Sequence, residues 1–375
     1  MHILVVNAGS SSLKLRLLDD RDAVVGSADL DRPDAAGLPA ALADFLDGVP
    51  DPDAAGHRVV HGGTAFPGPV LLDEGSEALL ETLGDLAPLH NPQSLDAVRA
   101  LGTLRPGLPA VACFDTSFHH DMPPLATTYA IPREWRERWD LRRFGFHGLS
   151  HSWSARRAAG LLGRPVDGLR LVTAHLGAGA SLAAVASGRS VDTTMGFTPL
   201  EGLVMATRSG SVDPGLLLWV LQHGGLTVDR MAHALEHESG LEGLWGGGGD
   251  LRRVIRAADD GDGEARLAYD VTVHRLRSQV ASMTSALGGL DGLVFTGGAG
   301  RGSHRLRTDV CAGLGFLGVA LDDDADAAAG AEGEDRVVSP DAAPAAVVVV
   351  EAREDLEIAR HVREVLGRSA APPGD

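Results

Sequence analysis

A turn of small polar residues between two apolar runs holds the residues best suited to bind phosphate. The turn, residues 7–12, contains Asn7, Gly9 and three serines, and the flanking runs 3–6 and 13–18 are typical of the two strands of a β-hairpin. Backbone N–H groups, the hydroxyls of Ser10 and Ser12 and one amide can point into such a turn, and Lys14 adds a positive charge beside it. The alternative is an ordinary Gly/Ser turn with no role in binding. Lys14 is the only lysine among the 33 lysine and arginine residues, and this favours a functional role for Lys14 and its turn.

This turn is not a Walker phosphate loop, because Leu13 precedes Lys14 and Leu15 follows it. The pattern recurs in residues 169–185, where His175 corresponds to Asn7 and Gly177 to Gly9. A third glycine-rich stretch, residues 293–300, again follows an apolar run. The repetition predicts an internally duplicated protein of two lobes.

Charged and polar residues follow several other predicted strands. Asp115 comes directly after the buried run 110–114, at the end of a strand where ligands of α/β sheets collect. Arg58 lies in the short strand stretch 56–63, and Arg208 lies in the Thr-, Gly- and Met-rich stretch 190–213. An arginine fork binds carboxylate or phosphate through two hydrogen bonds, although a surface ion pair is the alternative for each arginine.

Length and composition limit the classes of function. A chain of 375 residues predicts two domains, and its net charge of −18 argues against nucleic acid and anionic membranes as partners. Cys113 and Cys311 have no metal-ligand spacing and suit a reducing compartment. The chain shows no signal peptide and no apolar run of the roughly 18 residues that span a membrane. We therefore expect a cytoplasmic protein.

The motifs between the glycine-rich turns are more specific. The chain resembles the acetate kinase family, within the actin and sugar-kinase superfamily, along nearly its whole length. The matching stretches are NAGSSSLK (7–14), GHRVVHGG (56–63), APLHNP (87–92), FDTSFH (114–119), FGFHGLSH (144–151), MGFTPLEGL (195–203), MATRSGSVDP (205–214) and DLEIAR (355–360).

The resemblance implies an α/β fold, a duplicated two-lobed actin-like (ribonuclease H-like) ATPase with mixed sheets flanked by helices and the nucleotide in the interlobe cleft. The expected lobes are residues 1–148 and 149–353, with a C-terminal helix at 354–367 packing back on the first. The implied reaction is reversible, Mg²⁺-dependent and direct in-line phosphoryl transfer from ATP to acetate, giving acetyl phosphate and ADP. A homodimer joined through the second lobe is also implied.

The resemblance also assigns residues to roles. The catalytic group is Arg58, Asp115, His147 and Arg208. The acyl group and its methyl would contact Arg58, Val60, Leu89, His90, Phe146 and Pro199. The nucleotide and its phosphates would contact Asn7, Ser10, Ser12, Lys14, His175, Gly177, Gly179, Gly297, Gly298 and Gly300. Magnesium, with manganese as an alternative, would be held by Asn7 and Glu354. Asp115 could also ligate the metal, or orient Arg208 or the acceptor.

Departures from the family pattern gather on the nucleotide side. Ala178 and Ala180 stand where the family has an amide and a hydroxyl, and Arg301-Gly302 stands where Glu-Asn is usual, close to the expected adenosine. The altered second phosphate loop leaves one rival function, a nucleotide-binding sensor that has lost turnover. The other rival is a propionate or broader short-chain acyl kinase, which differs only in the depth of the acyl pocket. Val60 favours acetate, although one methylene changes binding by only about 1–3 kcal/mol.

Overall fold

The chain forms two compact units. The computed structural model describes residues 1–9, 12–31, 34, 36–87, 90–332 and 334–369. One unit comprises Met1–His120 and Arg353–Asp375, and the other comprises Asp121–Ala352. The first boundary therefore lies at residue 120, earlier than the 148 expected from the sequence. The reason is that the N–H groups of Phe144 and Gly145 donate to the carbonyl of Gly196 at 3.1 and 3.3 Å, which ties residues 121–148 to the second unit.

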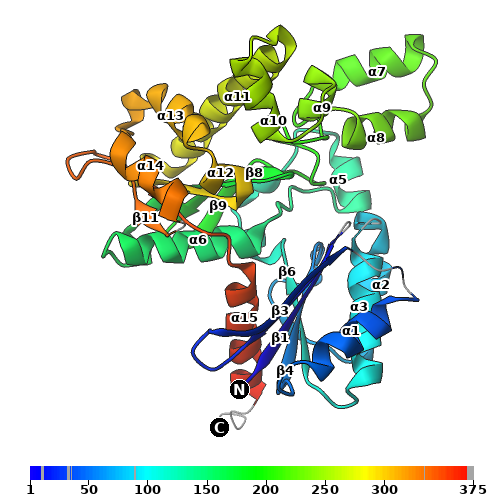
Figure 1. The fold of residues 1–375 in the computed structure, drawn as a ribbon. Helices are drawn as coiled ribbons and strands as arrows, with labels where there is room; N and C mark the ends of the chain where they lie inside the picture. The colour runs from blue at the N-terminus through cyan, green and yellow to red at the C-terminus, as the bar shows by residue number, and fades with distance from the viewer. Residues whose placement is uncertain (10–11, 32–33, 35, 88–89, 333, 370–375) are drawn as a thin grey trace. The chain divides into compact units, whose positions relative to one another are not determined.

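The first unit is built on a sheet of six strands in the order β3-β2-β1-β4-β6-β5 (Figure 1). The strands are β1 (Ile3–Ala8), β2 (Ser12–Leu18), β3 (Val24–Asp31), β4 (Ala54–Val59), β5 (Val70–Leu71) and β6 (Ala110–Phe114). β1 pairs antiparallel with β2 and parallel with β4, and β4 pairs parallel with β6. The predicted hairpin is therefore confirmed, and β1, β4 and β6 end at the same edge of the sheet.

The second unit repeats this topology. Its sheet has the order β11-β12-β10-β7-β8-β9. The strands are β7 (Arg170–Leu176), β8 (Ala180–Ala186), β9 (Arg189–Thr193), β10 (Gly292–Thr296), β11 (Arg336–Val337) and β12 (Ala346–Val349). As β1 does in the first unit, β7 pairs antiparallel with the next strand and parallel with a strand that follows a crossover. Asn7 and His175 are each the penultimate residue of the equivalent strand, so the predicted duplication is confirmed.

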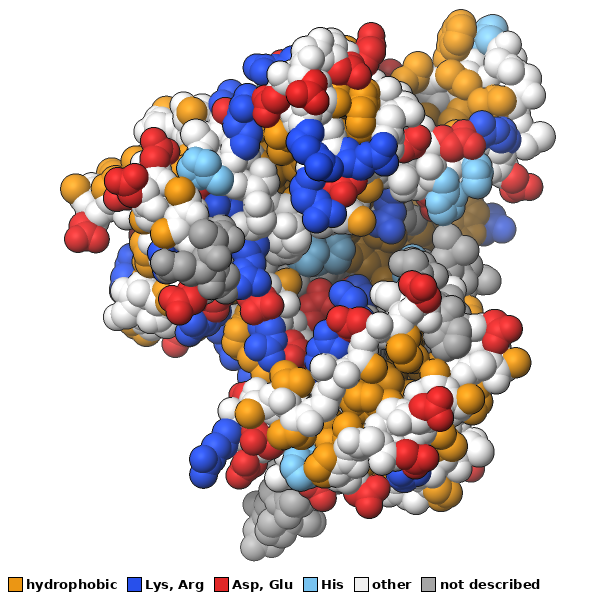
Figure 2. Space-filling view, viewed as in Figure 1, with side chains coloured by type: hydrophobic (Ala, Val, Ile, Leu, Met, Phe, Trp, Pro, Cys, Tyr) orange, Lys and Arg blue, Asp and Glu red, His pale blue; other side chains and the backbone are white. Residues whose placement is uncertain are grey.

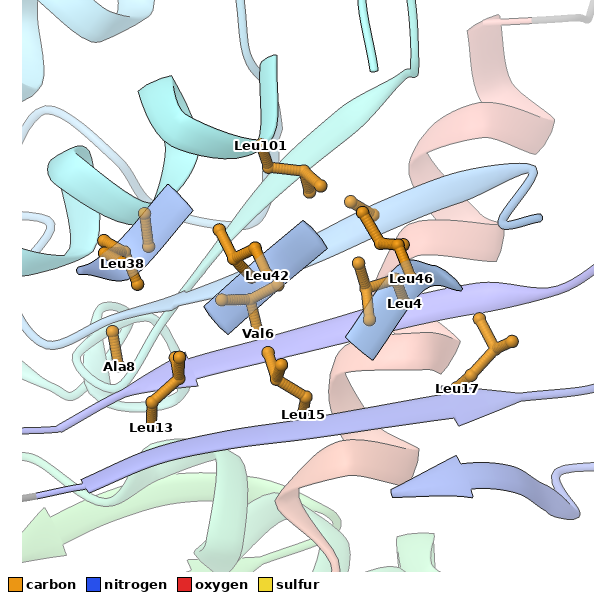
Figure 3. Close-up of a cluster of buried hydrophobic side chains, with 12 residues drawn as sticks. Leu4, Val6, Ala8, Leu13, Leu15, Leu17, Leu38, Leu42, Leu46 and Leu101 are labelled. Atoms are coloured by element: carbon orange, nitrogen blue, oxygen red, sulfur yellow. The ribbon is translucent and has the colours of Figure 1, made fainter. Parts of the chain in front are cut away.

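Helices cover both faces of the first sheet. They are α1 (Leu38–Asp47), α2 (Glu74–Thr82), α3 (Asn91–Leu104) and α15 (Glu354–Ser369), with short 3₁₀ turns at Gly84–Leu86 and Ser117–His119. Figure 3 shows the apolar layer under α1 and α3, where Leu42 and Leu101 face Val6 and Leu15 of the sheet. On the other face, a Cβ added to Gly56 would approach Ile358 of α15 to 2.4 Å. Only glycine allows α15 to pack this closely on β4.

The second sheet lies between α11 on one face and α6 on the other (Figure 1). The helices of this unit are α4 (Pro124–Thr127), α5 (Arg133–Trp139), α6 (Gly148–Leu161), α7 (Pro214–His223), α8 (Val228–His237), α9 (Gly240–Trp245), α10 (Leu251–Asp259), α11 (Gly263–Leu287), α12 (Gly297–Gly302), α13 (His304–Ala312) and α14 (Asp323–Glu332), with 3₁₀ turns at Val166–Gly168 and Gly315–Leu317. Among the described residues, no helix is both long and apolar enough to cross a bilayer.

Candidate active site

Four polar residues of the first unit meet where its strands end. Asn7 lies near the end of β1, Arg58 near the end of β4 and Asp115 directly after β6, while Glu354 begins α15. Arg58 Nε and Nη2 donate to the two carboxylate oxygens of Asp115 at 3.1 and 2.5 Å. Arg58 Nη1 donates to Asn7 Oδ1 at 3.2 Å, and Asn7 Nδ2 donates to Glu354 Oε2 at 3.3 Å. Residues from both ends of the chain thus form one cluster.

Arg58 is held as a cation by two carboxylates. Burial alone would lower the pKa of Arg58, but the Asp115 and Glu354 carboxylates more than offset burial, and the pKa lies above its ordinary value. Asp115 is only 1% exposed, whereas Arg58 is 16% exposed. Asp115 therefore orients Arg58, a role that the sequence did not predict for it.

The hairpin of the first unit places further candidates beside this cluster. Asn7 and Lys14 are opposite each other in the β1–β2 pairing, so both side chains lie on the face of the sheet that carries Arg58. The turn closes with a hydrogen bond of 2.8 Å from Gly9 N–H to the carbonyl of Ser12. Ser10 and Leu89 lie outside the described residues. Val60 is buried after β4, and His90 directly precedes α3 as its N-cap residue.

In the second unit, two histidines predicted for the site are stacked. The rings of His147 and His175 lie 4.4 Å apart, with an interplanar angle of 26°. His147 Nδ1 is 2.9 Å from Ser181 Oγ, and His175 Nδ1 is 2.8 Å from Ser150 Oγ. His147 has a φ of 58°, a left-handed conformation that costs energy for a residue other than glycine and recurs at functional sites. The hydroxyls behind the two rings were not predicted, because an isolated serine carries no signal in the sequence.

Arg208 is the second candidate cation, and its surroundings differ from those of Arg58. Its Nη1 donates to the carbonyl of Pro199 at 3.3 Å, and within the described part of the chain it makes no ion pair. Burial lowers the pKa of Arg208, and the more distant Glu236 offsets this only in part. Among the described residues no carboxylate forms an ion pair with this partly buried guanidinium, so its charge could be balanced by a bound anion.

Gly179 is where His147 and Arg208 converge. A Cβ at this position would lie 3.3 Å from the His147 ring and 3.6 Å from Arg208 Nη1. A side chain at this position of the turn between β7 and β8 would be in tight contact with the His147 ring and in van der Waals contact with Arg208. Phe146, the other residue predicted around the acyl group here, is buried directly before His147.

A cavity of about 590 Å³ opens beside the same turn. Its walls come from the β7–β8 turn, the segment after β9, α10, α11 and α12, and Figure 2 shows the charged groups on one face of the molecule around these elements. The lining includes Gly177 and Gly298, as predicted, together with Ala178. It also includes apolar side chains that were not predicted, among them Leu203, Leu241, Leu251, Leu276 and Leu306. A volume of this size with mostly apolar walls suits a nucleoside.

The other glycines predicted for the nucleotide are not in the lining. Gly297 has a φ of 77°, and a Cβ there would meet the carbonyl oxygen of Leu176 at 2.7 Å, so this glycine allows α12 to pack on β7. Gly300 also faces β7. Arg301, expected close to the adenosine, is not in the lining either: its Nη1 lies 3.3 Å from Glu351 Oε1. This departure from the family pattern therefore leaves the cavity open.

The duplicated α/β topology and the glycine-rich turns are those of an actin-like ATPase fold. The acetokinase family model matches residues 45–360. The chain is 45% identical to acetate kinase of Leifsonia xyli subsp. xyli over 97% of this chain and 98% of that protein. It belongs to the acetokinase family.

Solved structures agree with this assignment. The crystal structure of Porphyromonas gingivalis acetate kinase superposes with a TM-score of 0.90 at 35% identity, covering 97% of this chain and 99% of that one. A propionate kinase from Francisella tularensis subsp. tularensis has a TM-score of 0.88 at 34% identity, covering 96% and 98%. The two neighbours differ in their named acceptor, so fold similarity alone does not decide between acetate and propionate.

Proposed function

We propose that this protein is an acetate kinase, which transfers the γ-phosphoryl group of ATP to acetate directly and reversibly. The observation that carries the proposal is Arg208, a partly buried cation that makes no ion pair among the described residues and that approaches Gly179 together with His147. The chain is 45% identical, over nearly its full length, to a protein named acetate kinase, and this identity supports acetate as the acceptor.

The chemistry brings two anions together, so catalysis depends on neutralising charge and aligning the reactants. In our proposal Arg208 binds the γ-phosphoryl group, which is the anion whose bonds change during transfer. His147 donates a hydrogen bond to the oxygens of the same group. Arg58, oriented by Asp115, neutralises the second anion. The backbone N–H groups of the β7–β8 turn hold further phosphate oxygens, and Lys14 supplies a positive charge for phosphate.

We propose that the first unit holds the magnesium ion that this chemistry uses. Asn7 and Glu354 offer amide and carboxylate oxygens, the hard ligands that Mg²⁺ prefers, and Glu354 is 18% exposed. Among the described residues no group of three or more His, Cys, Asp or Glu could form a metal site. Phosphate oxygens and water would therefore complete the shell. When bound, the ion would neutralise phosphate charge.

The direct test is a hydroxamate assay for acyl phosphate with Mg²⁺-ATP and, in parallel, acetate, propionate and butyrate. We expect acetate to give the highest kcat/KM. A higher kcat/KM with propionate would keep the mechanism but change the acceptor. Nucleotide binding without product from any of the three would instead support the sensor.

The missing amide at position 178 gives a prediction for the nucleotide side. Ala178 is exposed at the β7–β8 turn and lines the cavity, so an asparagine fits there without displacing the core. Ala178→Asn is expected to lower the KM for ATP about tenfold, the value of one hydrogen bond to a charged phosphate. Initial rates at varied ATP would measure this, with Ala178→Ser as a shorter control. An unchanged KM would mean that backbone donors already suffice.

We also propose that the protein is a homodimer that buries helix α7. Leu218 and Trp219 are each 59% exposed on this helix, and Val228 of α8 is 72% exposed. Figure 2 shows hydrophobic side chains gathered at the end of the second unit that carries these helices. Such a patch is larger than isolated exposed side chains and marks an interface.

Trp219→Asp is expected to convert the dimer to monomer, because a buried unpaired carboxylate is costly. Sedimentation velocity would measure the change. Phe316→Asp is the control, since Phe316 is 75% exposed outside this patch. A monomeric wild type, or a Trp219→Asp variant that stays dimeric, would contradict the assignment of this surface.

Separately, the buried free thiols of Cys113 and Cys311 support our proposal of a reducing, cytoplasmic location.

A further inference from the structure

The segment that carries Pro199 is held by side chains with no role in the proposed chemistry. Pro199 supplies the carbonyl oxygen that Arg208 Nη1 contacts at 3.3 Å. The position of this carbonyl therefore depends on what holds residues 194–201, which form neither helix nor strand.

The carboxylate of Glu201 joins two side chains from the region before α6. Tyr129 donates its hydroxyl to Glu201 Oε2 at 2.8 Å, and Arg143 Nη2 donates to Glu201 Oε1 at 2.8 Å. Burial raises the pKa of the Tyr129 phenol above its ordinary value, so the hydroxyl keeps its proton and acts as a donor. Both carboxylate oxygens are thus engaged.

The same two side chains also bind the backbone of the segment. The N–H of Phe197 donates to the Tyr129 hydroxyl at 2.8 Å. Arg143 Nη1 donates to the carbonyl of Met195 at 2.8 Å and to that of Thr194 at 3.2 Å. These bonds satisfy backbone groups of a segment that has no regular structure of its own.

Gly196 makes the arrangement sterically possible. A Cβ there would come within 1.9 Å of Glu201 Oε2 and 2.3 Å of the Tyr129 oxygen. The carbonyl of Gly196 also accepts the N–H groups of Phe144 and Gly145, directly before the turn that carries His147. The segment with Pro199 and the segment with His147 are therefore fixed to each other at this glycine.

We propose that Tyr129, Arg143 and Glu201 are positioning residues that place the Pro199 carbonyl and, through it, the guanidinium of Arg208 relative to His147. This role rests on the proposed function, because it matters only where Arg208 acts on a reacting anion. A displacement of about 1 Å in such a group can cost 10²-fold in rate.

A double-mutant cycle tests whether these residues act through Arg208. Glu201→Gln keeps the size of the side chain and removes its charge. We expect this variant to lower kcat in the hydroxamate assay about 10- to 10²-fold with the KM for ATP unchanged. In the Arg208→Ala background, the same substitution should cause no further loss, because residues that act through one another are not additive.

Asp291→Asn is the matched control. Asp291 pairs with Arg170 at 3.0 Å elsewhere in the second unit. The substitution should therefore leave kcat unchanged. If Glu201→Gln does not fold, Tyr129→Phe removes one donor and one acceptor of the same arrangement. An equal loss of kcat in both backgrounds, or no loss in either, would overturn the positioning role while leaving the proposed function intact. A wild type without acyl kinase activity would overturn both.

Discussion

Replacing Arg208 by alanine is expected to lower kcat/KM for acetyl phosphate formation about 10²- to 10³-fold, the scale of a lost charge-stabilising donor in other active sites. The stability of the protein, in contrast, should not fall. The guanidinium is mostly buried and makes no ion pair among the described residues, so its removal leaves no carboxylate unpaired. The free energy of unfolding should therefore stay the same or rise.

Initial-rate kinetics and urea denaturation on the same preparations would separate the two effects. Arg208→Lys keeps the charge but loses the planar fork, and we expect it to recover only part of the rate. Arg266→Ala is a control at an exposed arginine that pairs with Asp270 within one helix, and it should match wild type in both measurements. Turnover near that of wild type in Arg208→Ala would remove Arg208 from the proposed mechanism.

Arg58→Ala should reduce activity on the same scale but also destabilise the protein. Its partner Asp115 is 1% exposed and would lose the guanidinium that binds both of its carboxylate oxygens. Removing one member of a buried pair costs about 3–5 kcal/mol of stability. The midpoint of urea unfolding should therefore fall in Arg58→Ala, whereas it should not fall in Arg208→Ala.

A second substitution separates stability from catalysis at Arg58. Asp115→Asn in the Arg58→Ala background removes the buried negative charge that Arg58 balanced, so it should recover much of the free energy of unfolding. Activity should not recover, because the cation that neutralises the substrate is still missing. Recovery of both would mean that Arg58 serves the fold rather than the reaction.

Local patterns sufficed for the hairpins, the duplication and the run that forms β6, because apolar alternation and small polar turns report directly on strands. The boundary at residue 120 was missed because it depends on hydrogen bonds to Gly196, far along the chain. The lining of the cavity in the second unit was only partly anticipated for the same reason. Leu203, Leu251 and Leu276 come from separate elements, and nothing in their local sequence distinguishes them from core leucines.

The family motifs predicted which residues belong to the candidate site better than they predicted the contacts of those residues. Arg58 and Arg208 look alike in the sequence, yet a carboxylate, that of Asp115, binds Arg58, whereas a backbone carbonyl and the sulfur of Met205 contact Arg208. Gly297, Gly298 and Gly300 share one motif, but only Gly298 lines the cavity. Such differences arise from packing between elements, which the order of residues along the chain does not show.

The place of α15 in the first unit has a consequence for biosynthesis. Met1–His120 lack the helix that covers one face of their sheet, and Arg353–Asp375 supply it only after the intervening 121–352 have been made. The face around Gly56 that receives Ile358 therefore stays uncovered while a ribosome synthesises the second unit. The second unit is continuous in the chain and can fold first, so the N-terminal unit is the last to be completed.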